Sequence, residues 1–322
     1  MTEAFLGPFQ RWTMQAGALF IVGIAAWRWI VWPRSVLMVS EGARLGEVGR
    51  RSDETLSSVA GMGCTAATVL LGAWLLAFLV NILGFRDPFV PLREDAVFLL
   101  TRTFWGRVWM VQGILAVGLV SVFASLAQSR ARVPDCEGSD TLAARRSPGW
   151  ATATSLAIAL PVTMALSSHA MSVSGDGRLI AVGADSVHIL AAGTWIGSLT
   201  VILLLGYQSE YEPPFIASQL RAFSPMALVA VPLLVLMGGT LGLQHVPTIQ
   251  DLWEAPYGRV LVGKVLLAGV VLFVGFVNWR RGLPVLDSHT GLRSVRRRAA
   301  FEVGLAGVVL GFTAALTGMT TP

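Results

Sequence analysis

The sequence has 322 residues, of which 54% are hydrophobic and 13% are charged, with a mean hydropathy of +0.66 and a formal net charge of +5. Soluble domains do not reach this apolar content, so the composition indicates a polytopic membrane protein. The positive charge then reports the orientation of loops in a membrane rather than nucleic-acid binding.

Eight apolar runs of the length that crosses a hydrocarbon core predict an all-α fold of eight transmembrane helices. Four of them lie in an N-terminal half, residues 1–167, and four in a C-terminal half, residues 168–322. Glycine and alanine are dense within the runs, as close helix packing in lipid requires. The predicted spans are residues 12–32, 59–80, 105–127, 150–167, 186–206, 225–243, 259–279 and 299–319.

Arginine is distributed unevenly between the two sets of connecting segments. The segments after the first, third, fifth and seventh spans hold fifteen arginines, whereas the termini and the other loops hold five. Because cytoplasmic loops carry the excess of basic residues, both termini are predicted to lie outside the cytoplasm.

With this orientation, three of the four histidines lie on the outward face. His169 ends the fourth span, His188 begins the fifth and His245 ends the sixth, and Met171 follows His169 after one residue. Imidazole and thioether ligands suit copper, and they add no charge to the bilayer. The sequence therefore predicts a copper site at His169, His188, His245 and Met171, although the same positions also suit histidines that only occupy the headgroup layer.

Two charged residues fall inside or beside the last two spans. Lys264 lies about five residues inside the seventh span, where it either snorkels to the outer interface beside Arg259 or pairs inside the bundle, and snorkelling is the expectation. Glu302 is expected to form an ion pair at the cytoplasmic edge of the eighth span, next to the arginines at 296–298.

Several short runs in the second half form a set. They are H-x6-W-x-G from His188 to Gly197, R-A-F-S-P-M-A from Arg221, and Y-G-R-x4-K from Tyr257 to Lys264, followed by Asn278, Glu302 and Pro322. This set resembles the copper resistance protein D (CopD) family of bacterial inner-membrane proteins. The resemblance covers the last four spans well and the first four only in general layout.

The resemblance implies a multi-pass protein of the bacterial inner membrane that transports copper and is not an enzyme. It also implies that Trp195, Tyr257 and Lys264, with Asp185 before His188, support the histidine site. No outer loop or terminus is long enough for a copper-carrier domain, so a periplasmic carrier of the CopC type is expected to be a separate chain. Lipids are the other expected partners.

Energy from a nucleotide is not expected, because the sequence has no Walker A phosphate-binding loop. The two cysteines, Cys64 and Cys136, have neither the spacing of a zinc site nor that of a disulfide framework. The favoured function is inward transport of a copper ion, Cu(I) or Cu(II). The alternatives are a membrane b-type cytochrome, in which two histidines at similar depth hold a haem, and a structural subunit without a ligand.

Overall fold

The computed structural model describes residues 2–40, 45–84, 86–128, 148–172, 175, 177–208, 213–246 and 248–319. Cys136, Asp176 and the arginines at 44, 130, 132, 145 and 146 lie outside the described residues, as does the His169 side chain. Within the described residues the chain is helical, and no strand is present.

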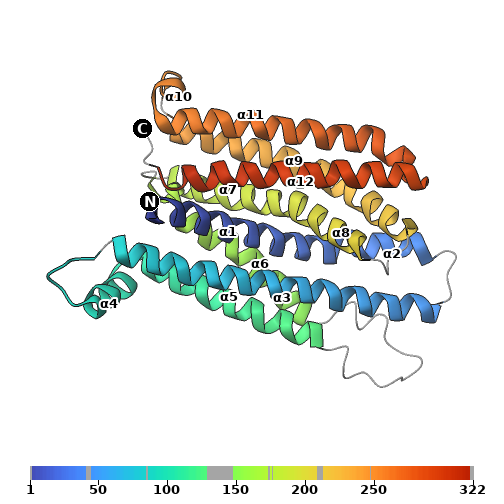
Figure 1. Cartoon of the computed structure of the whole chain (residues 1–322), viewed down its shortest axis with the longest axis horizontal. Helices are drawn as coiled ribbons and strands as arrows, with labels where there is room; N and C mark the ends of the chain where they lie inside the picture. Colours follow the sequence, from blue (N-terminus) through green and yellow to red (C-terminus); the bar gives the residue numbers. More distant parts are fainter. Residues whose placement is uncertain are drawn as a thin grey trace.

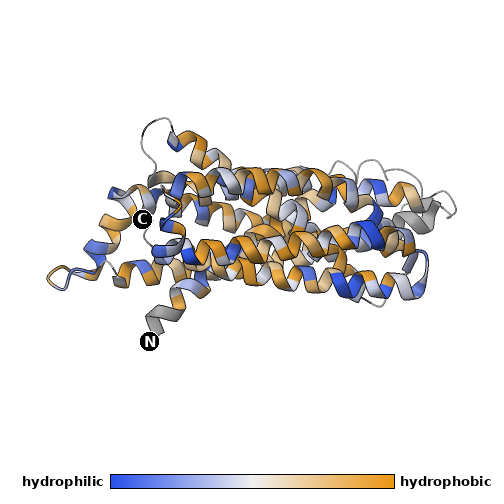
Figure 2. Cartoon of the chain, turned by 90° about the horizontal axis from the view of Figure 1, so that it is seen from above, coloured by the Kyte–Doolittle hydropathy of each residue, from blue (hydrophilic) through white to orange (hydrophobic). Residues whose placement is uncertain are grey.

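Among the residues that the structure describes, eight helical segments are long and apolar enough to cross a membrane, which confirms the predicted number of spans. Most extend beyond the predicted limits; for example, the first runs over Leu6–Met38 and the last over His289–Leu316. Polar residues gather towards the two ends of the bundle and apolar residues fill its middle (Figure 2), as a bilayer requires.

Several spans contain more than one helical element. The first consists of α1 (Thr2–Ala26), the π-helix η1 (Trp27–Val31) and α2 (Trp32–Ser40), and the fifth consists of α7 (Gly177–Ala192), the π-helix η5 (Gly193–Gly197) and α8 (Ser198–Tyr207). The seventh joins α11 (Pro256–Val277) to the π-helix η6 (Asn278–Gly282) and the short η7 (Leu283–Val285). The other elements are α3 (Leu45–Gly84), α4 (Leu92–Arg102), α5 (Phe104–Gln128), α6 (Pro148–Leu166), η4 (His169–Ser172), α9 (Pro213–His245), α10 (Asp251–Glu254) and α12 (His289–Leu316).

Helix α1 occupies the centre of the bundle (Figure 1). It packs against α3 and α6 on one side and against η5, α8 and α12 on the other. Its beginning and the end of α12 lie at the same end of the bundle, where Arg11 contacts Gly318, as an even number of crossings requires. Because α1 contacts helices of both halves, the division at residue 167 stays a prediction.

The contact between α1 and η5 depends on glycine. A Cβ atom at Gly23 would overlap the backbone of Gly197, and the Ser198 hydroxyl donates a 3.0 Å hydrogen bond to the Gly23 carbonyl. Small residues let helices approach closely in lipid. The glycine that ends the H-x6-W-x-G run therefore brings the fifth span directly against the first.

Helices α9 and α11 lie at the outside of the bundle. Both expose many of their large apolar side chains, among them Leu236 on α9 and Leu266 on α11. An apolar surface of this extent suits a face in contact with lipid tails.

Candidate functional site

His188 lies between α7 and α9. Because α7 begins at Gly177, His188 lies eleven residues inside the fifth span, and the prediction that it begins this span is wrong. Its Nδ1 atom is 3.0 Å from the carbonyl oxygen of Leu234, and a Cβ atom at Gly238 would lie 2.9 Å from its Cε1 atom. A carbonyl oxygen only accepts, so Nδ1 carries the hydrogen and donates it. In the neutral ring, Nε2 then keeps its lone pair, which is how protein scaffolds commonly orient a metal-binding histidine.

Three further polar side chains interact with His188 or with one another, and we call the four residues the His188 cluster. Asp185 lies one turn earlier on α7, where it accepts a 2.7 Å hydrogen bond from Ser168. Lys264 on α11 interacts electrostatically with both Asp185 and His188, and Tyr257 on α11 interacts with Asp185. The influence of Asp185 on Lys264 favours pairing inside the bundle over the expected snorkelling to the interface beside Arg259.

The segment that carries His169 and Met171 lies against the same part of α7. Element η4 packs against α6 and α7, and the Ser168 hydrogen bond fixes the preceding residue to Asp185. Met171 is half-buried. The structure thus brings the backbone of His169 near the His188 cluster.

His245 lies nearer the end of the bundle than His188 does. It ends α9, and its Nδ1 atom is 2.7 Å from the carbonyl oxygen of Leu241 in the same helix. His188 contacts α9 at Gly238, seven residues earlier, which is about 10 Å along a helix axis. Since the two histidines differ in depth, the structure does not support their joint ligation of a haem.

A closed metal-binding cage is not formed by the described side chains. Within the described ranges, no group of three or more histidine, cysteine, aspartate or glutamate side chains is arranged to hold a metal ion.

Glu302 forms a second polar group deeper in the bundle, and with Trp195 and Asn278 it makes up what we call the Glu302 cluster. It is 2% exposed, accepts a 3.0 Å hydrogen bond from the Asn278 amide, and accepts another from the Trp195 indole. The expected ion pair with the arginines at 296–298 is wrong. Helix α12 begins at His289, not near residue 299, so Glu302 lies in its middle rather than at the membrane edge. The only sequence signal for the Glu302 cluster is a carboxylate within an apolar span.

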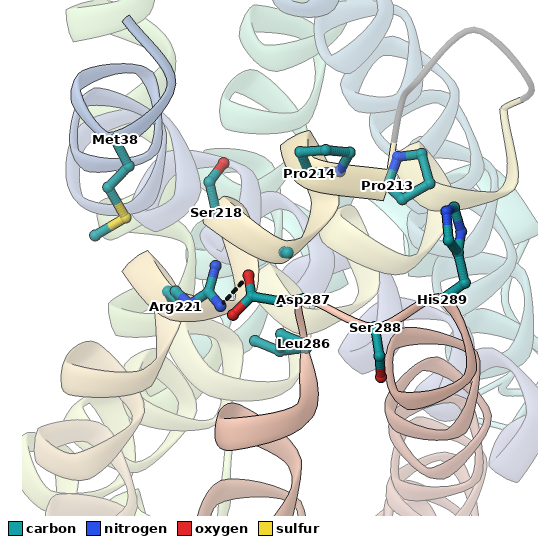
Figure 3. Close-up of a pocket in the computed structure, with 10 residues that line it drawn as sticks. Met38, Pro213, Pro214, Ser218, Arg221, Leu286, Asp287, Ser288 and His289 are labelled. Carbon is teal, nitrogen blue, oxygen red and sulfur yellow. Dashed lines mark hydrogen bonds and ion pairs between the residues drawn. The ribbon is translucent and has the colours of Figure 1, made fainter. Parts of the chain in front are cut away.

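A pocket of about 690 Å³ lies at the opposite end of the bundle from the His188 cluster (Figure 3). Arg221 and Asp287 form an ion pair of 2.8 Å within it, and Met38 and His289 lie towards its two sides. The arginines of η6 and of the first turns of α12 lie at this end among the described residues. The pocket had no signal in the sequence, because its walls come from α2, α9 and the turn before α12.

Comparisons with known proteins agree with the resemblance given by the motifs. Residues 217–316 match the family described as Copper resistance protein D (CopD). The chain is 25% identical over 265 residues to Copper resistance protein D of Pseudomonas syringae pv. tomato, covering 77% of this chain and 80% of that protein. It is 26% identical over 246 residues to Copper transport protein CutJ of Bacillus subtilis, covering 74% of this chain but only 41% of that protein. No solved structure matches the chain.

Proposed function

We propose, from the match of residues 217–316 to the CopD family, that this chain transports copper ions across the bacterial inner membrane towards the cytoplasm. The observation that carries the proposal is His188, whose Nδ1 atom is held by the Leu234 carbonyl so that Nε2 is available as a ligand. Both relatives are named for copper resistance or copper transport, so the proposed role is transport rather than catalysis.

The proposed orientation has both termini and the His188 end of the bundle facing the periplasm. The arginine count supports it, because loops rich in arginine stay in the cytoplasm. The His188 cluster then lies on the entry side of the membrane.

The proposed path begins at the outer end of the bundle. His169, His245 and Met171 receive copper near the surface, and His188 takes it about two turns deeper. These ligands are neutral, so each holds copper weakly enough to pass it on. Asp185, Lys264, Tyr257 and Trp195 position this route. A separate periplasmic carrier of the CopC type is the proposed donor, and membrane lipids surround the bundle.

The test compares His188→Ala with His289→Ala, which removes an exposed histidine at the opposite end of the bundle. Purified protein is assayed for bound copper and iron by elemental analysis, and proteoliposomes are assayed for copper uptake. We expect His188→Ala to lower bound copper and the initial uptake rate by about tenfold or more, as loss of a metal-site contact does, and His289→Ala to change neither. Unchanged uptake in His188→Ala would remove this residue from the proposed route, and iron with a haem absorption band would favour a cytochrome.

A further inference from the structure

Glu302 lies where a carboxylate is costly. It is 2% exposed and near the middle of α12, about 20 Å from either end at the rise of an α-helix. Ionisable side chains at this depth in a membrane protein are rare and are usually functional.

The two side chains that hydrogen bond to the carboxylate are neutral. The Asn278 amide and the Trp195 indole donate to it, and neither compensates a negative charge. A buried anion without a countercharge is strongly disfavoured, whereas a bound proton removes the charge altogether.

Charged and titratable groups on the elements packed against α12, and on α12 itself, are directed elsewhere. Arg11 lies beside Gly318, Arg28 lies over the rings of Trp29 and Trp150, and Arg296 lies over Tyr207. Arg298 bonds to Ser294, Arg221 pairs with Asp287, and Lys264 and Tyr257 interact with Asp185. His245 lies at the end of α9, and Arg259, Arg280, Arg281, His289, Arg293 and Arg297 are exposed.

The Asn278 amide can serve both protonation states of the carboxyl group. Its Nδ2 atom donates to Oε2 of Glu302 at 3.0 Å, while its Oδ1 atom is buried without a hydrogen-bond partner among the described residues. Rotation of the amide by half a turn would place Oδ1 where it accepts the O–H of a protonated carboxyl group. The unused oxygen is therefore explained if Glu302 alternates between the two states.

The backbone around the carboxylate is irregular on both sides. Trp195 lies in the π-helix η5, and Asn278 begins the π-helix η6. A Cβ atom at Gly275 would lie 3.1 Å from Oε1 of Glu302 and 3.2 Å from the Trp195 ring, so this glycine leaves the space that the carboxylate occupies. Single π-helical turns are frequent at functional sites.

We propose that Glu302 binds and releases a proton during transport, and that its charge couples proton movement to copper movement at His188. This rests on the proposed copper-transport function. Trp195 follows His188 by seven residues along one continuous span, about 10 Å. Ionised Glu302 attracts a cation at His188, and protonation removes that attraction, because the interaction crosses a medium of low polarity. A proton from water forms the O–H bond, and copper arrival favours its return to water.

The test uses Glu302→Gln, a neutral imitation of the protonated state, with Glu94→Gln as the control at an exposed position on α4. Proteoliposomes with a pH-sensitive dye inside receive Cu(I) kept reduced by ascorbate or, separately, Cu(II). We expect Glu302→Gln to keep copper uptake down its gradient, and to lose both copper-dependent proton flux and the response of uptake to an imposed pH gradient. Glu94→Gln should match the parent.

Asn278→Leu keeps the carboxylate and removes both functions of the amide, and we expect it to shift the pH midpoint of uptake. This variant remains informative if Glu302→Gln does not fold. Copper uptake by the parent without proton flux, or proton flux retained in Glu302→Gln, would overturn the coupling alone. A parent protein that moves no copper would overturn the transport function together with the coupling.

Discussion

Lys264 lies on α11, where its ammonium group interacts electrostatically with the Asp185 carboxylate and with His188. We predict that Lys264→Met lowers both the thermal stability of the detergent-solubilised protein and copper uptake, because it removes a positive charge that attracts Asp185. Lys264→Glu should lower both further, since it places two like charges together. Arg259→Met, at an exposed position on the same helix, is the matched control and should behave like the parent.

A double-mutant cycle separates the pair from other effects. Contacting residues in one polar network usually show coupling of roughly 0.5–3 kcal/mol, so Lys264→Met combined with Asp185→Asn should lose less stability than the sum of the single changes. If Lys264→Met changes neither stability nor uptake, Lys264 does not pair with Asp185, and a position at the outer interface is favoured instead.

At the scale of elements, the crossing of α1 and η5 positions Trp195, and through it the Glu302 cluster. A Cβ atom at Gly197 would overlap the Leu19 carbonyl oxygen and lie 2.9 Å from the Cα atom of Gly23. We predict that Gly197→Ala destabilises the bundle by about 1–3 kcal/mol, the usual cost of overpacking. Gly304→Ala is the control, because no atom lies within 4 Å of the added carbon. Equal melting temperatures for the two variants would show that the helices separate freely at this crossing.

The elements also show what the sequence could and could not predict. Eight spans followed from the length of the apolar runs, because lipid imposes that length regardless of tertiary contacts. The beginning of α12 could not be predicted from the apolar run, because its first turns carry arginines that lower hydropathy without ending the helix. Glu302 was therefore predicted at the edge of the span instead of its middle. The π-helices that carry Trp195 and begin at Asn278 have no comparable periodic signal, since they depend on packing against other helices.

At the scale of the whole molecule, the two ends of the bundle differ in chemistry. One end carries the beginning of α1, the end of α12 and His245, with the His188 cluster about two turns deeper, and the other carries the arginines of η6 and of the first turns of α12 and the pocket around Arg221 and Asp287. Because each described span crosses from one end to the other, successive connections alternate between these two ends. One accessibility measurement at each end therefore fixes the orientation of all eight spans.

We predict that the His188 end faces the periplasm. The chain is first freed of Cys64 and Cys136 by serine substitution, and then carries either Phe89→Cys or Val285→Cys. Phe89 is 93% exposed in the turn between α3 and α4, and Val285 is 40% exposed in η7 at the arginine-rich end. A membrane-impermeant maleimide should label Phe89→Cys in cells with only the outer membrane permeabilised, and Val285→Cys only after lysis. The reverse pattern would place His188 on the cytoplasmic side, and because its imidazole lies near that end of the bundle, the same residues would then favour copper export.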